Sequence, residues 1–162
     1  MCKMGQLALY KEPFILIIMI KVKKEFGLKD VPKVAQELLP YVKEARIVTF
    51  TGPLGAGKTT LIRSLAKELG IKDRITSPTF AYFVTYHMPD SKCVYHFDLY
   101  RLKSINEFYE SGFDEHFYLP QCKVLIEWPE IVLSILPRET LDIKLDYVED
   151  NPKKRIIIID SK

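Results

Sequence analysis

Cysteines are scarce in this sequence, and their arrangement predicts neither a disulfide framework nor a zinc site. The three cysteines, Cys2, Cys93 and Cys122, are odd in number and form no C-x-x-C pair. Disulfides are rare in cytoplasmic proteins, and closely spaced cysteine pairs are the usual signature of zinc or redox sites. We therefore expect reduced thiols in a cytoplasmic protein.

A long hydrophobic run is also missing. FILIIMI, at positions 14–20, has only seven residues, whereas a membrane-spanning helix needs about 20. A signal peptide is disfavoured, because KVKKEF follows the run where small residues would mark a cleavage site. We interpret the run as a buried strand or an extension, residues 1–18 as an N-terminal extension of uncertain status, and residues 19–162 as one domain. Met19 is an alternative start of the protein.

The sequence has no excess of one charge sign. It contains 24 Lys and Arg against 21 Asp and Glu, a net charge of +3. This balance does not indicate nucleic-acid binding from charge alone. With 48% hydrophobic and 28% charged residues and no internal repeat, the composition is that of a globular protein with a substantial core.

Hydrophobic periodicity predicts an α/β fold. Strand patterns alternate with helix patterns around one strand–loop–helix unit, and the hairpin patterns make the sheet mixed. We therefore predict a P-loop NTPase-like mixed sheet, with a parallel core, antiparallel flanking hairpins and helices on both faces. Asp30, Gly70 and Ser104 are the expected helix caps. The expected strands cover 20–26, 45–52, 80–87, 92–98, 122–128, 141–148 and 153–160, and the expected helices cover 31–44, 61–70 and 104–112.

The segment GPLGAGKT matches the phosphate-loop pattern G-x-x-x-x-G-K-[ST] and lies between a predicted strand and a predicted helix, as the motif requires. Its glycines let backbone N–H groups turn toward phosphate oxygens, although Pro53 removes one such donor. Lys58 is expected to reach the β- and γ-phosphates in a catalytic role, and Thr59 to ligate Mg²⁺. The expected loop contacts to nucleotide are Gly52, Pro53, Leu54, Gly55, Ala56, Gly57, Lys58, Thr59 and Thr60.

Two acidic residues end predicted strands. Glu127 ends the strand KVLIE, where a Walker-B acid would lie, and Asp98 ends the strand VYHFD. Open α/β sheets bind ligands at the carboxyl ends of their strands. A solvated carboxylate is the alternative for each residue. Because a phosphate loop is present, we expect at least one of the two to reach Mg²⁺ or the attacking water.

Four sequence blocks resemble the TsaE (YjeE) family, the small P-loop ATPases of bacterial tRNA threonylcarbamoyladenosine biosynthesis. The blocks are GPLGAGKTTLIRSLAKELG, TSPTF (76–80), VYHFDLYRL (94–102) and LIEWPE (125–130). The resemblance implies ATP or ADP and Mg²⁺ as ligands and slow ATP hydrolysis. It also implies association with the threonylcarbamoyl-transferase heterodimer of TsaD- and TsaB-like proteins, which modifies adenosine 37 of tRNA. The tRNA would be reached only through that complex, and no membrane is involved.

The same resemblance implies roles for individual residues. Thr59 and Glu127 would hold Mg²⁺. Asp98 would act at the γ-phosphate side, where it would orient or deprotonate water or hold a metal-bound water. Thr79 of SPTF resembles a switch-type threonine near the γ-phosphate. The adenine contacts would come from residues 26–31, upstream of the first helix.

Three further residues keep alternative interpretations. His96 is either a packed or hydrogen-bonded structural residue, part of a partner surface or active site, or a metal ligand. The interpretation as a metal ligand is disfavoured, because the other two histidines, His87 and His116, do not lie at metal-ligand spacing from His96. Arg101 either pairs with an acid or stabilises phosphate charge. Trp128 is expected in the core or facing a partner rather than stacked on adenine.

Two other functions compete with an ATPase of tRNA modification. A small-molecule kinase is disfavoured, because a strand and a helix precede the phosphate loop and no arginine cluster lies between positions 60 and 130. A nucleotide-sensing module without hydrolysis is disfavoured by the joint presence of Lys58, Thr59, Asp98 and Glu127.

Overall fold

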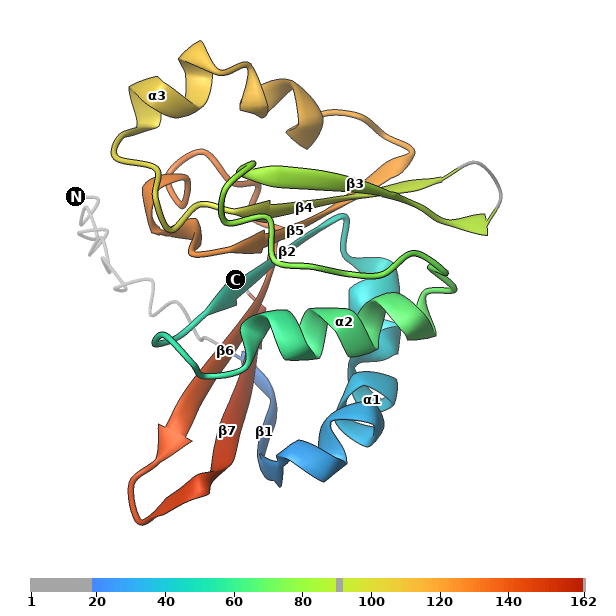
Figure 1. Ribbon diagram of the computed structural model, residues 1–162, viewed down its shortest axis with the longest axis vertical. Helices are drawn as coiled ribbons and strands as arrows, with labels where there is room; N and C mark the ends of the chain where they lie inside the picture. Colours follow the sequence, from blue (N-terminus) through green and yellow to red (C-terminus); the bar gives the residue numbers. More distant parts are fainter. Residues whose placement is uncertain (1–18, 90–91, 162) are drawn as a thin grey trace, which may run out of the picture.

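A computed structural model describes residues 19–89 and 92–161 (Figure 1). Seven strands form one sheet in the order β1-β7-β6-β2-β5-β4-β3. The strands are β1 (Met19–Gly27), β2 (Ile47–Thr51), β3 (Phe83–His87), β4 (Cys93–Asp98), β5 (Cys122–Glu127), β6 (Leu141–Val148) and β7 (Asn151–Ser161). The helices are α1 (Val31–Glu44), α2 (Lys58–Glu68) and α3 (Ile105–Glu110), with short 3₁₀ turns η1 (Leu28–Asp30), η3 (Phe113–Phe117) and η4 (Pro129–Ile131).

The centre of the sheet is parallel and its flanks are antiparallel. Strand β2 pairs in parallel with β5 and β6, and β5 pairs in parallel with β4. Strand β3 runs antiparallel to β4, while β7 runs antiparallel to both β6 and β1. This arrangement confirms the predicted mixed sheet. Because the parallel strands end at one edge, Asp98 and Glu127 become direct neighbours in the β4–β5 ladder.

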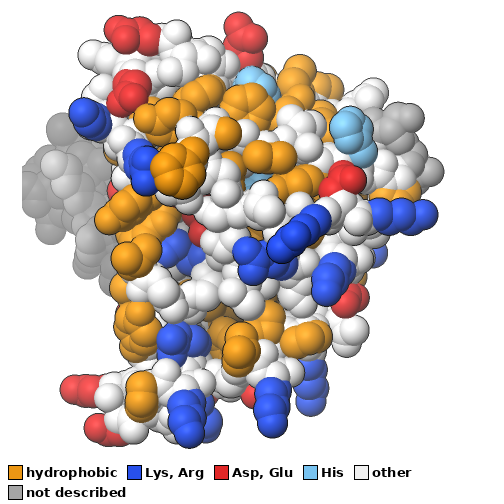
Figure 2. Space-filling view, in the orientation of Figure 1, with side chains coloured by type: hydrophobic (Ala, Val, Ile, Leu, Met, Phe, Trp, Pro, Cys, Tyr) orange, Lys and Arg blue, Asp and Glu red, His pale blue; other side chains and the backbone are white. Residues whose placement is uncertain are grey.

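Helices cover both faces of the sheet, as predicted (Figure 1). Helices α1 and α2 pack on one face through side chains such as Leu38 and Leu65, which are fully buried. On the other face, α3 and η3 cover an aromatic cluster in which the Phe108 and Phe117 rings lie 5.1 Å apart. On the face of the molecule drawn in Figure 2, Lys and Arg side chains are scattered and do not form one patch.

Local signals predicted most element boundaries. The first helix has its predicted bounds, Gly70 ends α2 with φ 83°, and Ser104 caps α3 by accepting from the Glu107 N–H at 3.2 Å. Asp30 does not cap α1 through its side chain; instead its carboxylate accepts from the Gly27 N–H at 2.9 Å. Strand β3 is shorter than predicted, because a turn precedes it and Tyr82 has a left-handed φ of 62°.

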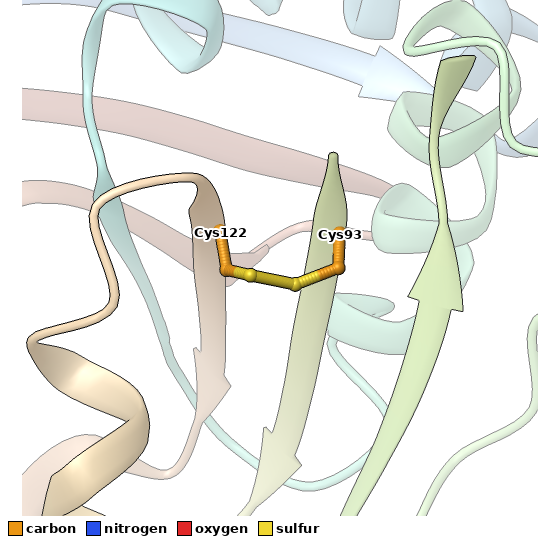
Figure 3. The surroundings of a disulfide bond; sticks show 2 residues. All are labelled: Cys93 and Cys122. Atoms are coloured by element: carbon orange, nitrogen blue, oxygen red, sulfur yellow. A yellow bond between two sulfur atoms is a disulfide. The ribbon is translucent and has the colours of Figure 1, made fainter. Parts of the chain in front are cut away.

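The prediction of reduced thiols is wrong for two of the three cysteines. Cys93 and Cys122 form a disulfide between the first residues of β4 and β5, with their Cα atoms 4.6 Å apart (Figure 3). They lie 29 positions apart in sequence and face each other in the parallel ladder. No spacing rule reveals this pairing, because the sheet topology alone makes these strands neighbours.

Several predictions concern residues outside the described part. Cys2, most of the 14–20 run and the proposed extension 1–18 lie outside 19–89 and 92–161. The alternative start at Met19 and the division into extension and domain stay predictions. No helix in the described part is both long and apolar enough to cross a membrane.

Candidate active site

The predicted phosphate loop connects β2 to α2 at the edge where the parallel strands end. Helix α2 begins at Lys58, where the helix after a phosphate loop is expected to start, so its amino end directly follows the loop. Gly52, Gly55 and Gly57 have φ values of 131°, 75° and 101°, which L side chains rarely adopt. At Gly52 a Cβ atom would lie 1.9 Å from the Leu145 carbonyl oxygen. The glycines therefore allow both the curl of the loop and its close approach to β6.

Lys58 is buried in the mouth of this loop, with 5% of its surface exposed. Its Nζ donates to the carbonyl oxygens of Gly52 and Pro53, at 2.7 and 3.1 Å, and lies 3.7 Å from the centre of the Trp128 ring. Burial lowers the pKa of Lys58, while neighbouring carboxylates, Glu127 foremost, act in the opposite direction. The ammonium is thus held beside acids but without a direct ion pair in the described part of the chain.

Thr59, Glu127 and His96 form a continuous hydrogen-bonded chain. The Thr59 hydroxyl lies 2.9 and 2.8 Å from the two carboxylate oxygens of Glu127. The Nε2 atom of His96 lies 2.8 Å from Glu127 Oε1, with His96 fully buried and Glu127 only 3% exposed. His96 is therefore hydrogen-bonded to an acid on the neighbouring strand, which agrees with the structural alternative.

Asp98 is held by two hydroxyl groups and one backbone N–H. Thr79 Oγ1 and Ser77 Oγ donate to Asp98 Oδ2 at 2.6 and 2.9 Å, and the Tyr100 N–H donates to Oδ1 at 3.2 Å. Asp98 is 4% exposed, so it is not the solvated strand-end carboxylate considered as the alternative. Thr79 is among the predicted site residues, but the contact from Ser77 was not predicted. The Ser-x-Thr spacing is the sequence feature that could have indicated it.

These groups meet around one pocket of about 350 Å³. Most of the predicted residues line it, together with Ser77, Tyr100, Trp128 and Arg101, for which a phosphate-stabilising role was one of two alternatives. Gly52 and Pro53 contribute through their carbonyl contacts to Lys58. The predicted residues that line the pocket are Leu54, Gly55, Gly57, Lys58, Thr59, Thr60, Thr79, Asp98 and Glu127.

A family profile described as "Threonylcarbamoyl adenosine biosynthesis protein TsaE" matches residues 27–157. The chain belongs to the TsaE family. The family resemblance seen in the sequence is therefore confirmed, and the matched segment contains every candidate site residue described above.

Individual relatives support the same family. The chain is 38% identical over 134 residues to the tRNA threonylcarbamoyladenosine biosynthesis protein TsaE of Rickettsia felis, which covers 82% of this chain and 77% of the relative. It is 40% identical over 113 residues to the protein of the same name from Treponema pallidum, covering 70% of this chain and 82% of the relative. The crystal structure of Bacillus subtilis YdiB superposes with a TM-score of 0.66 at 28% identity, covering 88% of this chain and 87% of that chain.

Trp128 and Arg101 both line the pocket of this TsaE-family chain, and each contacts an aromatic ring. Trp128 has a left-handed φ of 58°, and its ring lies 4.8 Å from that of Tyr100. The Arg101 guanidinium lies 4.3 Å from the centre of the Phe80 ring and forms no ion pair with a described residue. Trp128 lines the pocket instead of lying in the core, and a partner-facing role for it stays a prediction. Arg101 stacks on an aromatic ring and forms no ion pair with a described acid.

The oxygen ligands at the pocket suit Mg²⁺, which needs few protein ligands, better than a metal ion whose ligands all come from the protein. Within the described residues, no group of three or more His, Cys, Asp and Glu side chains forms a metal site. Mg²⁺ usually takes one or two protein ligands and completes its shell with phosphate oxygens and water. The Thr59 hydroxyl and the Glu127 carboxylate, which are already in contact, provide such a pair.

A second pocket of about 710 Å³ adjoins the loop on the side of α1. Residues 26–31 line one wall, and Gly55, Ala56, Gly57 and Thr60 line another. Lys153 and Arg155 from β7 complete it. The segment from which the family resemblance implies adenine contacts therefore lies directly beside the phosphate loop.

Proposed function

We propose that this chain binds ATP or ADP and slowly hydrolyses ATP with Mg²⁺, as a component of tRNA threonylcarbamoyladenosine biosynthesis. The observation that carries this proposal is the meeting of the phosphate loop with two acids from β4 and β5 in one pocket. Thr59 contacts Glu127 directly, and Asp98 stands on the adjacent strand.

The loop binds the phosphates. Backbone N–H groups and the amino end of α2 supply positive partial charge, and the Lys58 ammonium leaves its two loop carbonyls to contact the β- and γ-phosphates. The nearby carboxylates favour the charged form of Lys58 despite its burial. The proposed nucleotide contacts are Gly52, Pro53, Leu54, Gly55, Ala56, Gly57, Lys58, Thr59, Thr60 and Thr79.

Thr59 and Glu127 are the proposed holders of Mg²⁺, which when bound would neutralise charge on the phosphate oxygens. Their present hydrogen bond keeps both oxygens at one point of the pocket. His96 also holds the carboxylate, through Oε1, and its ring is fully buried and cannot reorient freely. The binding geometry is thus largely preorganised.

Asp98 is proposed to act on the attacking water at the γ-phosphate side, by orienting it or accepting its proton. The hydroxyls of Ser77 and Thr79 fix Oδ2, and the Tyr100 N–H fixes Oδ1. A carboxylate held by three donors keeps its direction, which is what positioning of a water molecule requires.

The adenine base and ribose are proposed to occupy the second pocket. Its volume of about 710 Å³ suits a nucleoside, and its walls combine the half-buried end of β1 with the loop glycines. A nucleotide bound across both pockets would place its phosphates over Lys58 and its base near residues 26–31.

The proposed partners are the TsaD- and TsaB-like threonylcarbamoyl-transferase heterodimer and, through it, tRNA. The relatives that carry the name of this pathway cover most of the chain, which supports the assignment. The chain would support turnover of the transferase that modifies position 37 and would not transfer the group itself.

Reconstitution tests the proposal. The chain is mixed with the heterodimer, tRNA, threonylcarbamoyl-adenylate and Mg-ATP, and both ATP hydrolysis and modified tRNA are measured. We expect hydrolysis to be stimulated by the complex and modification to exceed one turnover only with the active chain. ATPase activity insensitive to these partners, with a phosphorylated small molecule as product, would instead identify a kinase.

A further inference from the structure

The disulfide lines a pocket at the opposite end of the parallel strands from the phosphate loop. Cys93 and Cys122 begin β4 and β5, whereas Asp98 and Glu127 end them. The pocket has a volume of about 590 Å³, and both half-buried cysteines line it. Both cysteines therefore border a cavity at the surface of the folded sheet.

This pocket is cationic. Among the residues that the structure describes, four basic side chains line it against two acidic ones, Glu44 and Glu68. Among the described residues, none of the four forms an ion pair, and the buried Nη1 atom of Arg46 has no hydrogen-bond partner. The basic residues are Lys43, Arg46, Lys92 and Lys123.

Two of these lysines flank the disulfide directly. Lys92 precedes Cys93, and Lys123 follows Cys122. Both lysines line the pocket, and burial, followed by the charge of Lys92, lowers the pKa of Lys123 to about 8. The Lys123 ammonium also donates to the Lys43 and Ala45 carbonyls at the end of α1. Positive charge therefore lies in the pocket that the two cysteines line, at the end of the strands where β4 and β5 begin.

We propose that Cys93–Cys122 is a thiol–disulfide exchange site for low-molecular-weight anionic thiols. The lysines raise the local concentration of a negatively charged thiol and stabilise a thiolate that leaves the pair. This chemistry is independent of the nucleotide-binding function and uses none of its residues.

The exchange proceeds in two balanced steps. An incoming thiolate attacks one sulfur of the pair, so that a mixed disulfide forms, the Cys93–Cys122 bond breaks, and the other cysteine leaves as a thiolate that takes a proton from water. A second thiolate then attacks the mixed disulfide at the sulfur of the small molecule. This step releases the oxidised small-molecule dimer and the second cysteine, so two electrons pass from two thiols to the protein. The reverse reaction uses that dimer as the oxidant.

Comparison of thiols with different charge tests the proposal. The oxidised protein, in a Cys2→Ser background, is treated with glutathione (anionic), β-mercaptoethanol (neutral) or cysteamine (cationic). Mixed disulfides and free thiols are quantified by acid quench, alkylation and mass spectrometry, and rates are expressed per thiolate. We expect the preference for glutathione over β-mercaptoethanol to fall about twofold or more in Lys92→Gln, and to fall as salt rises toward 0.15 M.

Controls separate the local charge from other causes. Lys92 is exposed, so Lys92→Gln is expected to fold, and Lys103→Gln, an exposed lysine outside this pocket, should leave the preference unchanged. Lys123→Gln provides a second variant at the other cysteine. The proposal is overturned if oxidised glutathione does not form the Cys93–Cys122 bond from the reduced protein, if the pair reacts only in denaturant, or if the preference for glutathione is the same in wild type, Lys92→Gln and Lys103→Gln.

Discussion

The Thr59 hydroxyl donates to the carboxylate of Glu127 at 2.8–2.9 Å, although 68 positions separate the two residues. Parallel pairing of β2 with β5 produces this contact, because Phe50 pairs with Glu127 and the phosphate loop begins just beyond Phe50. The pair joins the predicted phosphate loop to the acid that ends β5.

Glu127→Gln should impair Mg²⁺-dependent hydrolysis much more than nucleotide binding. The amide keeps an acceptor for Thr59 but loses the charge that attracts a cation. We expect kcat to fall about 100-fold, while the affinity for ADP in EDTA stays within about threefold. Steady-state ATPase assays over a Mg²⁺ series and calorimetric ADP titrations measure the two effects. Lys58→Ala is the contrast, because it should weaken ADP binding itself; unchanged Mg²⁺-dependent hydrolysis in Glu127→Gln would remove Glu127 from the metal site.

His96 is predicted to be a positioning residue for Glu127. His96→Leu removes the partner of Glu127 Oε1 from a fully buried site. Loss of such an outer partner typically costs about 10- to 100-fold in metal affinity. We expect the Mg²⁺ concentration for half-maximal ATPase to rise about tenfold, and His96→Gln, which can still donate a hydrogen bond, to recover part of the loss. A uniform fall in activity at all Mg²⁺ concentrations would indicate general damage to the core instead.

The sequence could predict the convergence of these acids but not their partners. Asp98 and Glu127 end predicted strands, and parallel strands end at one edge of a sheet, so the pattern predicts that both acids lie at that edge but not that they are neighbours. The contact from His96 to Glu127 depends on strand register, which pairs His96 with Leu125, two positions before Glu127. The same register brings Cys93 against Cys122. Neither the order of strands nor their register is visible in hydrophobic periodicity, which reports only which face of a strand is buried.

Gly52 is predicted to be the least replaceable residue of the phosphate loop. Its φ of 131° excludes ordinary side chains, and a Cβ atom would lie 1.9 Å from a backbone oxygen of β6. We expect Gly52→Ala to lower the free energy of unfolding by about 3 kcal/mol or more. Gly112→Ala is the matched control, because φ is +68° there but nothing lies within 4 Å of the added atom; about 1 kcal/mol is expected. Urea unfolding of both variants measures the difference, and equal losses would contradict the steric argument.

Reduction of the disulfide should lower stability without changing the fold. The bond closes a loop between positions 29 residues apart. Loss of that constraint on the unfolded chain costs about 3–4 kcal/mol in the chain-entropy account, which corresponds to a fall in Tm of roughly 7–15 °C for a chain of this size. Thermal unfolding with and without reductant measures the change. The Cys93→Ala/Cys122→Ala protein should match the reduced wild type and show no response to reductant.

The last prediction uses the lowered pKa of Lys123. In the folded protein its pKa is about 8, against an ordinary value of 10.5, so between these two values the unfolded chain binds more protons than the folded one. The contribution of Lys123 to the free energy of unfolding therefore rises with pH between these two pKa values. Below the folded-state pKa, Lys123 is charged in the folded protein, so both the burial of its charge and the repulsion from Lys92 destabilise the fold. The other charged residues that line the pocket are Lys43, Glu44, Arg46 and Glu68.

Lys92→Gln should remove that repulsion. We expect the variant to be more stable than wild type at pH 7, by about 0.5 kcal/mol because solvent screens this partly exposed pair, and to lose the advantage by about pH 10, where Lys123 is neutral in both folded proteins. Urea unfolding at the two pH values measures the difference, and NMR titration of the Lys123 side chain in the variant should show its pKa moved upward. A stability difference that is the same at both pH values would mean that Lys92 acts on something other than the charge of Lys123.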